Sequence, residues 1–330
     1  MNRRIFLRSL FGIVALGTST WAFLKESVAA RALSSFITAG EKEVSNAPLT
    51  AVVFKEKTFK DIPAVKFLVL GDWGAGGSFQ KSIAMQMLLK AQTEAPQFIL
   101  STGDNIYPNG VSSVDDKQWQ TKFKNVYTGE ALKLPWYAVL GNHDYRLSPE
   151  AQVEYSKHDP QWNMPERYFT FKKDFPDATN VEFFMLDTQK MLTDKAEREL
   201  QAKWLDEQLL KSKARWKVVV GHHMIRSHGI YGDQEFMLKS VKPVLDKHGV
   251  DIYICGHDHD LQLLKAKEDR FTCLISGAGG GARNTSYGKN TKFAATNGGF
   301  NYIAVTENEM HIQFINRQGK VIFAHSITKS

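Results

Sequence analysis

Five apolar runs of the chain end in a glycine followed by residues that could bind a metal ion or transfer a proton. Two of the runs, "VLGD" and "STGD", end in aspartate, and "VLGNHD", "VVGHH" and "ICGHDH" end in asparagine or histidine. In open α/β sheets, ligands bind at the carboxyl ends of the strands, and glycine lets the backbone turn sharply there. The sequence therefore predicts that these side chains meet in one crevice. They are Asp72, Asp104, Asn142, His143, His222, His223, His257 and His259.

Each of these motifs alone has a simpler interpretation. Gly-Asp after a strand is most often a turn or a helix cap, and a single histidine there is more often a hydrogen-bonded structural residue than a ligand. The "GHDH" motif is more specific, because His257 and His259 lie two residues apart and can reach adjoining metal positions. Turn formation does not explain why all five motifs occur together at strand ends.

The donor atoms of this set restrict the kind of metal site. They are oxygen and nitrogen atoms, with no cysteine sulfur, which excludes a thiolate zinc site or an iron–sulfur cluster. They also exceed the four ligands that a single tetrahedral zinc ion needs. Two metal ions that share a bridging carboxylate fit the number of ligands.

The elements that must position these residues follow from the hydrophobic pattern. From Val65 onward, apolar runs alternate with stretches of helical periodicity, at 78–92, 115–129, 194–213 and 233–249. This alternation is typical of an α/β fold whose central strands are buried on both faces. After residue 260 apolar segments alternate with turns and no helix, which predicts strands paired largely antiparallel to one another. The glycine-rich segment 279–299 predicts a mobile loop near the site.

Composition indicates a soluble globular protein without disulfide staples. The chain has 330 residues, of which 43% are apolar and 23% charged, as is ordinary for this class. Its two cysteines, Cys255 and Cys273, do not make a disulfide framework. Both lie in apolar runs and are interpreted as buried core residues. Their spacing leaves open whether they touch.

The first 32 residues are typical of an export signal. Arg3 and Arg4 precede an apolar stretch that is shorter than the roughly 20 residues of a transmembrane helix, and small residues such as Ala30 follow, as a signal peptidase requires. The run "NRRIFLR" resembles the twin-arginine export motif, with an ordinary secretory signal or an uncleaved anchor as alternatives. We therefore expect a signal at 1–32, a leader or linker at 33–65 and a catalytic domain at 66–330.

The same prediction implies a periplasmic or secreted protein that is not stably anchored in a membrane once the signal is removed. Removing residues 1–32 takes away five basic residues and one acidic residue, which lowers the formal net charge from +7 to +3. Net charge then gives no argument for nucleic-acid binding. A small positive excess suits an anionic small substrate, and we expect a monomer.

The order of the motifs resembles that of a known family. GD, GDNxxY, GNHD, GHH and GHDH occur in the order found in calcineurin-like metallophosphoesterases, and "GDWGAGG", "PWYAVLGNHDY" and "LISGAGG" are similar to the small, tartrate-resistant type of purple acid phosphatase. The likeness runs from about Lys66 to about Gly281. It implies a four-layer α-β-β-α sandwich with mixed sheets. It also implies an acid phosphatase that hydrolyses monoesters of small phosphorylated substrates by attack of a metal-bound hydroxide.

The resemblance assigns ligands to two ions. One ion would be held by Asp72, Asp104, Tyr107 and His259, and the other by Asp104, Asn142, His222 and His257. Tyr107 would bind Fe(III) as a phenolate, because a phenol needs a strongly Lewis-acidic ion to lose its proton at working pH. The second ion would be divalent iron, zinc or manganese, and its ligand set does not choose among them.

The resemblance also implies proton-transfer groups. His143, beside Asn142, would hydrogen-bond the substrate or protonate the leaving group. His228 is the candidate for a second histidine, although its spacing from His222 is shorter than in the family, and His223 is the rival candidate. The remaining aspartates of the region, Asp187 and Asp258, would support the ligands or merely cap turns.

Three other functions remain open from the sequence. The same scaffold could serve a phosphodiesterase or nucleotidase, which a larger substrate domain would favour. Bound iron could support a redox activity. A binding protein that only sequesters metal or phosphate is the third alternative, against which His143 argues, since storage needs no proton donor.

Overall fold

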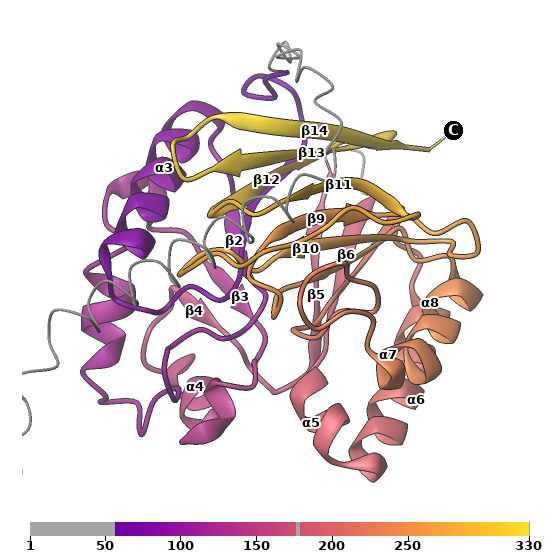
Figure 1. Cartoon of the computed structure of the whole chain (residues 1–330), viewed down its shortest axis with the longest axis horizontal. Helices are drawn as coiled ribbons and strands as arrows, with labels where there is room; N and C mark the ends of the chain where they lie inside the picture. Colours follow the sequence, from indigo (N-terminus) through magenta and orange to yellow (C-terminus); the bar gives the residue numbers. More distant parts are fainter. Residues whose placement is uncertain (1–56, 176–178, 330) are drawn as a thin grey trace, which may run out of the picture. The chain divides into compact units, whose positions relative to one another are not determined.

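Two seven-stranded sheets lie at the centre of the computed structural model, which describes residues 57–175 and 179–329 (Figure 1). The predicted signal at 1–32 and most of the predicted leader lie outside these residues. In spatial order, the first sheet contains β14 (Val321–Thr328), β13 (Glu309–Asn316), β12 (Gly299–Val305), β1 (Val65–Leu70), β2 (Phe98–Ser101), β3 (Trp136–Ala138) and β4 (Trp162–Asn163). The second contains β11 (Thr291–Ala295), β9 (Leu261–Leu264), β10 (Thr272–Ser276), β8 (Ile252–Cys255), β7 (Trp216–Val220), β6 (Asn180–Met185) and β5 (Phe169–Asp174).

Both sheets are mixed, with a parallel block and an antiparallel margin. Strands β1 to β4 are parallel in the first sheet, and β6, β7, β8 and β10 are parallel in the second. The strands after residue 260 pair antiparallel with one another, as predicted, and divide between the sheets. Strand β10 also pairs in parallel with β8, which precedes residue 260.

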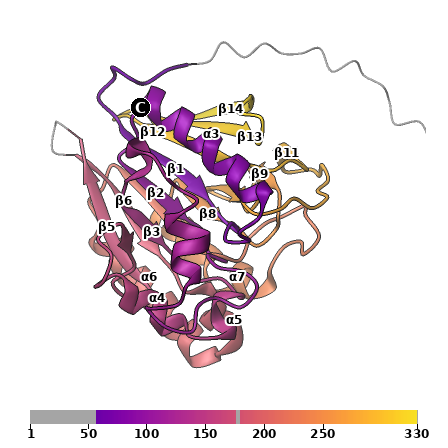
Figure 2. The same cartoon turned by 90° about the vertical axis from the view of Figure 1, so that its left-hand side faces the viewer.

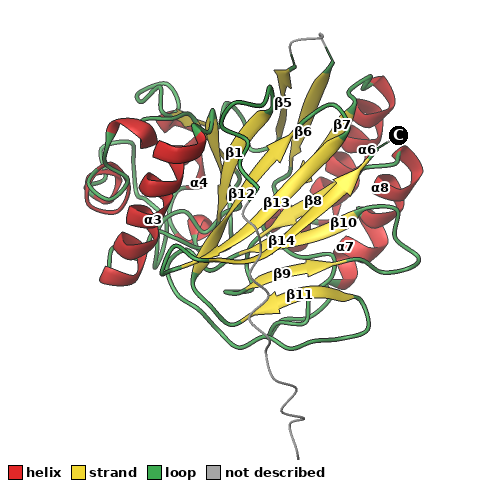
Figure 3. Cartoon of the chain, turned by 90° about the horizontal axis from the view of Figure 1, so that it is seen from above, coloured by secondary structure: helices red, strands yellow, loops and turns green. Residues whose placement is uncertain are grey.

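Helices cover the outer side of each sheet (Figures 2 and 3). On the side of the first sheet lie α3 (Ser78–Glu94) and α4 (Pro149–Tyr155). On the side of the second lie α5 (Thr188–Thr193), α6 (Lys195–Lys211), α7 (Glu235–Ser240) and α8 (Lys242–His248). The predicted α-β-β-α sandwich is confirmed. No helix in the described part of the chain has the length and apolar character that crossing a bilayer requires.

The layer between the sheets is built by the alternation of side chains along each strand. In β6, Phe183 belongs to the apolar cluster between the sheets, and Phe184 to the cluster under the helices. The Phe183 ring meets Phe67 of β1 edge-on, with centroids 5.4 Å apart, and Phe98 of β2 at 5.5 Å. Both sheets therefore share one aromatic core. Phe59 also joins this core, and it is 1% exposed.

Two predicted helices are wrong in extent. The stretch 115–129 contains only a wide helical turn, Trp119–Lys124, because the Asp116 carboxylate accepts from the backbone N–H groups of Ser112 and Gln118 and competes with a helix start. The stretch 233–249 divides into α7 and α8, since Pro243 has no N–H to continue the helix.

The glycine-rich segment 279–299 is also not a loop throughout. Thr291–Ala295 forms β11, which pairs with β9. Phe293 anchors this strand, with its ring 4.8 Å from Phe314 and 4.6 Å from Phe323. The two cysteines are buried, as predicted, and both are free thiols. Their strands, β8 and β10, are neighbours, which the sequence had left open.

Candidate metal centre

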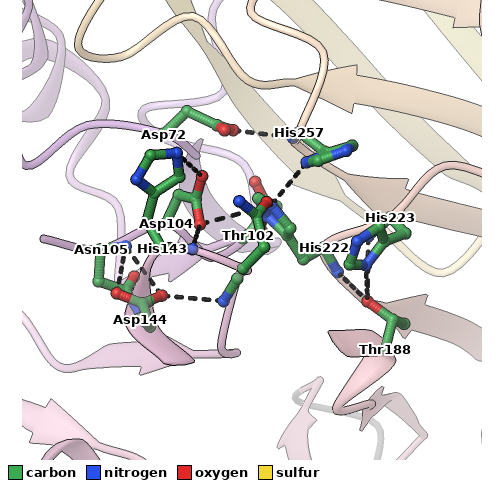
Figure 4. Close-up of polar contacts among 12 residues, drawn as sticks. Asp72, Thr102, Asp104, Asn105, His143, Asp144, Thr188, His222, His223 and His257 are labelled. Atoms are coloured by element: carbon green, nitrogen blue, oxygen red, sulfur yellow. Dashed lines mark hydrogen bonds and ion pairs between the residues drawn. The ribbon is translucent and has the colours of Figure 1, made fainter. Parts of the chain in front are cut away.

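The predicted ligands follow the carboxyl ends of parallel strands in both sheets. Asp72, Asp104 and Asn142 follow β1, β2 and β3 of the first sheet, and His222 and His257 follow β7 and β8 of the second. Parallel strands bring their carboxyl ends to one edge. The structure thus brings the side chains from both sheets together at one place, where Figure 4 shows several of them in contact.

One group of ligand atoms gathers around the phenol of Tyr107. Its Oη lies 3.1 Å from Asp72 Oδ1, 2.9 Å from Asp104 Oδ2 and 3.1 Å from His259 Nε2. Oδ1 of Asp72 and Nε2 of His259 are 3.4 Å apart. The single phenolic hydrogen cannot serve both carboxylates at once. Three oxygen and nitrogen atoms within about 3 Å of a fourth are instead typical of ligands that surround a cation.

A second group gathers around His222 Nε2. This nitrogen lies 3.2 Å from Asn142 Oδ1, 3.1 Å from His257 Nδ1 and 3.6 Å from Asp104 Oδ1. The other ring nitrogen, Nδ1, is 2.9 Å from the Thr102 carbonyl oxygen. The carbonyl can only accept, so Nδ1 carries the hydrogen and Nε2 presents a lone pair to the group.

Asp104 connects the two groups, because its two carboxylate oxygens belong to different ones. Oδ2 contacts the Tyr107 phenol, and Oδ1 faces His222 and accepts the backbone N–H of His143 at 2.8 Å. Asp72, Asp104 and His222 each offer an atom, all within 4.8 Å of one another, and all three are buried. The donor set therefore fits two metal ions with Asp104 between them.

The burial of these ligand side chains costs free energy unless a positive charge lies among them. It raises the pKa of the Asp72 carboxyl and of the Tyr107 phenol well above their usual values. It also lowers the pKa of His259 to about 4, with a contribution from the positive charge of Arg283. Buried oxygens that resist ionisation and imidazoles that resist protonation both become favourable ligands once a cation offsets the desolvation.

Three of the candidate ligands adopt a backbone conformation that non-glycine residues avoid. The φ angles of Asp72, Asp104 and His257 are 54°, 50° and 69°. Such left-handed positions cost on the order of 1–3 kcal/mol each and occur often at functional sites. Among the glycines that precede the ligands, Gly103 has a φ of 93°, as the predicted sharp turn requires, whereas Gly141 and Gly256 leave room for ligand side chains. A Cβ on Gly141 would lie 2.2 Å from Asp104 Oδ1, and one on Gly256 2.4 Å from Asp72 Oδ2.

Two residues that sequence reasoning did not select hold the ligand loops. The buried Asp144 carboxylate accepts backbone N–H groups of Asn105, Ile106 and Gly141 at 3.0, 3.2 and 2.8 Å, which ties the loop after β2 to the loop after β3 (Figure 4). Asp144 stands in the "GNHD" motif, and that was its only signal. Thr188 has no such signal.

Thr188 acts on the loop after β7. Its Oγ1 accepts the backbone N–H groups of His222 and His223 at 3.1 and 3.0 Å. The same oxygen lies 2.9 Å from His223 Nδ1. Its own hydrogen is therefore free to go to that nitrogen, which orients His223 as well as the ligand beside it (Figure 4).

The three histidines proposed for proton transfer lie in different environments. His143 Nδ1 is 2.5 Å from the Pro108 carbonyl oxygen, and the ring packs on Tyr107 with centroids 4.4 Å apart. His223 is 1% exposed, and burial lowers its pKa well below the usual value. His228 packs its ring where a Cβ on Gly288 would lie, and no ring hydrogen bond is found within the described residues.

The two aspartates assigned either a supporting or a capping role differ in what they contact. Asp187 caps α5 by accepting the backbone N–H of Lys190 at 3.0 Å, and it accepts the Tyr145 hydroxyl. Asp258 accepts the Ser227 hydroxyl and the Tyr231 N–H. It therefore fixes a loop beside the ligands.

Known proteins share both the sequence pattern and the architecture. The family model of the calcineurin-like phosphoesterases matches residues 65–261. Tartrate-resistant acid phosphatase type 5 of Mus musculus is 32% identical over 304 residues, which cover 81% of this chain and 91% of the mouse protein. Purple acid phosphatase 4 of Arabidopsis thaliana is 33% identical over 289 residues, which cover 81% of this chain and 84% of the plant protein.

Solved structures of other proteins have the same fold. GAP50, described as the anchor in the inner membrane complex of Plasmodium, superposes with a TM-score of 0.76 at 25% identity, over 81% of this chain and 89% of that one. A purple acid phosphatase from yellow lupin seeds (Lupinus luteus) has a TM-score of 0.59 at 12% identity, over 80% of this chain and 54% of its own, which supports the fold alone.

The chain belongs to the calcineurin-like phosphoesterases, and within them to the purple acid phosphatases. It is accordingly a hydrolase of phosphate esters, and membership implies a centre of two metal ions. The two groups of ligand atoms around Asp104 are the candidates for that centre.

Proposed function

We propose that this chain is an exported acid phosphatase that hydrolyses phosphate monoesters at a pair of metal ions. The observation that supports it most is the division of the Asp104 carboxylate between two groups of ligand atoms. That division gives a shared ligand, as an enzyme with two closely spaced ions requires.

The ligand assignment that we propose follows these contacts. Asp72, Asp104, Tyr107 and His259 would hold Fe(III), and Asp104, Asn142, His222 and His257 would hold divalent iron, zinc or manganese. When bound, the ions would supply a water of lowered pKa and neutralise charge on the phosphoryl oxygens. The chain's part is to hold the ligands in a buried, preorganised arrangement.

His143 is the group that we assign to the leaving-group oxygen. Its Nδ1 faces the Pro108 carbonyl oxygen, which can only accept, so Nδ1 carries a hydrogen and Nε2 is directed elsewhere. Nε2 lies 3.9 Å from Asp104 Oδ2, beside the ligands but not among them. Nε2 also faces Arg146 Nη2 at 3.4 Å, and a guanidinium only donates, so Nε2 must leave this contact to carry a proton to a departing alkoxide. His228 and His223 are the further candidates, and burial lowers the pKa of His223, which disfavours the protonated form that a proton donor needs.

Replacing Tyr107 tests the identity of the first ion. The oxidised protein should absorb visible light through charge transfer from the Tyr107 phenolate to Fe(III). Tyr107→Phe removes the oxygen that contacts Asp72 and Asp104 and should bleach or shift this band. The measurement is the visible spectrum of iron-loaded wild type and variant, with the iron content of each. An iron-replete wild type without visible absorption would contradict the assignment of Fe(III) to Tyr107.

The export route is a separate proposal, because its residues lie outside the described part of the chain. The pair Arg3 and Arg4 suits the twin-arginine route, which carries folded proteins, so the metal centre would be loaded before export. Replacing both residues with lysine should abolish export, measured as the fraction of protein in the periplasm or medium. Unchanged export of the double variant would indicate the general secretory route instead.

The rival functions remain distinguishable by substrate. A phosphodiesterase or nucleotidase on this scaffold would prefer diesters or nucleotides over simple monoesters, and a redox role of the iron would persist when hydrolysis is blocked. The relative named as an anchor carries this fold too. A sequestering role would leave the protein metal-loaded yet inactive on every phosphate ester.

A further inference from the structure

Two side chains outside the candidate ligand set form a pair beside it. Arg283 Nη1 donates to the Tyr231 hydroxyl at 2.9 Å, and its guanidinium carbon lies 5.8 Å from the centre of that ring. The Tyr231 ring in turn stacks on the ring of His257, with centroids 4.4 Å apart and planes 20° from parallel. Tyr231 is 45% exposed, so the pair stands where the site opens to solvent.

The segment that carries His257 and His259 holds both members of this pair. The Asp258 carboxylate, between His257 and His259, accepts the backbone N–H of Tyr231 at 3.3 Å. The backbone N–H of Arg283 donates to the His259 carbonyl oxygen at 2.7 Å. Both members are therefore fixed relative to the ligand residues, although they come from separate loops.

The charge of Arg283 lacks a counter-ion within the described residues. Arg226, by comparison, forms ion pairs with Asp233, Glu268 and Asp269 at 3.2, 3.0 and 2.7 Å. For Arg283, in contrast, no carboxylate comes within 4 Å among residues 57–175 and 179–329, and its bond to Tyr231 uses one of five N–H donors.

A guanidinium beside two metal ions is repelled by them unless an anion lies between. A phosphoryl group bound at the candidate centre would balance the charge of the metal ions. The guanidinium is bonded to the hydroxyl of the ring that stacks on His257, and it belongs to neither group of ligand atoms. It would therefore meet a group attached to the bound phosphoryl rather than the phosphoryl itself. Planar, forked donors suit carboxylate and phosphate oxygens in particular.

We infer that Arg283, positioned by Tyr231, binds a second anionic group of the substrate, so that the site prefers phosphate esters that carry a carboxylate or another phosphoryl next to the scissile one. This inference rests on the proposed phosphatase function and adds the substrate class to it. Arg283 contacts the substrate, whereas Tyr231 is a positioning residue.

The test compares two non-hydrolysable probes, ethylphosphonate and phosphonoacetate, of which the second has an additional carboxylate. Their dissociation constants from the metal-loaded, full-length chain are measured by titration calorimetry. Arg283→Gln should weaken phosphonoacetate by about tenfold to hundredfold, as for the loss of a hydrogen bond between charged groups, and leave ethylphosphonate nearly unchanged. Tyr231→Phe keeps the ring on His257 but removes the hydroxyl, and should give a smaller loss for phosphonoacetate alone.

The matched control is Arg270→Gln. Arg270 is exposed and precedes β10, at the end of that strand remote from the site, so the variant loses the same charge without altering the pair. Its selectivity should equal that of the wild type. Equal weakening of both probes by Arg283→Gln would overturn the inference, because Arg283 would then contact the scissile phosphoryl. Unchanged binding of both probes would overturn it as well.

Hydrolysis rates, compared with the binding of the probes, show whether a failure concerns this inference or the proposed function. If the wild type binds phosphonoacetate selectively through Arg283 but hydrolyses no phosphate monoester, the proposed function fails and the inference stands. If it hydrolyses phosphoglycolate and ethyl phosphate with equal kcat/KM, and Arg283→Gln changes neither, the inference fails and the proposed function stands.

Discussion

Asp104→Ala should lose both metal ions together and, with them, phosphatase activity by more than about 100-fold, a larger effect than removal of groups that merely support metal ligands. The reason is that Oδ2 and Oδ1 of this residue face separate groups of ligand atoms, so one substitution removes a ligand from each. Elemental analysis of the purified variant, together with its rate on a phosphate monoester, measures both effects. Retention of two ions per chain would contradict the bridging assignment.

The control for this variant is another buried aspartate at a strand end. Asp187 follows β6 and is 0% exposed, but it caps α5 and contacts no candidate ligand among the described residues. Asp187→Asn preserves the cap, since asparagine is an equally good N-cap, and should keep both ions. Asp104→Ala also places alanine at a φ of 50°, so its fold should be checked by circular dichroism before the metal result is interpreted.

His143→Ala should keep both ions and lower turnover on alkyl phosphates by roughly 10²–10⁴-fold, the usual contribution of a general acid. Its Nδ1 is occupied by the Pro108 carbonyl oxygen, and its Nε2 is not within 3.5 Å of a candidate ligand. The loss should shrink for nitrophenyl phosphate, because nitrophenolate needs little protonation to leave. The measurement is kcat for both substrates, with metal content determined on the same samples.

His158→Ala is the control for this variant, since His158 is exposed and pairs only with Glu154 within the described residues. Loss of a metal ion from His143→Ala would make His143 a ligand and change the site assignment. Wild-type rates on both substrates would move the acid elsewhere, with His228 and His223 as the next candidates.

The sequence predicted the buried strands and their ends, because a continuous apolar run followed by glycine is a local signal. It did not predict where the loops after those strands would go. A backbone hydrogen bond holds Arg283 beside His259, and the Asp258 carboxylate holds the backbone of Tyr231 beside His257. Such contacts join segments far apart in the chain, so no local pattern reports them. The role of Thr188 was missed for the same reason.

The wrong helix at 115–129 has a related cause. Trp119 and Phe123 have helical spacing and are buried, so the periodicity correctly reported which side chains face the core. The backbone differs from an α-helix because the Asp116 carboxylate, near the start of this stretch, accepts two backbone N–H groups. Helix α4 was not predicted, although Ser148 caps it and Pro149 occupies its first turn. Strand β11 depended on Phe293 packing against the other sheet, which only the folded chain provides.

The origin of the ligands in both sheets has a consequence for the stability of the molecule. Asp72, Asp104, Tyr107 and Asn142 follow strands of one sheet, and His222, His257 and His259 follow strands of the other. Ions held by this set would cross-link the two halves of the sandwich, which share no strand. By mass action they would stabilise the native state by about 4 kcal/mol at a free concentration of 1,000 times the dissociation constant. A chelator would then weaken the adhesion of one sheet to the other as well as stop hydrolysis.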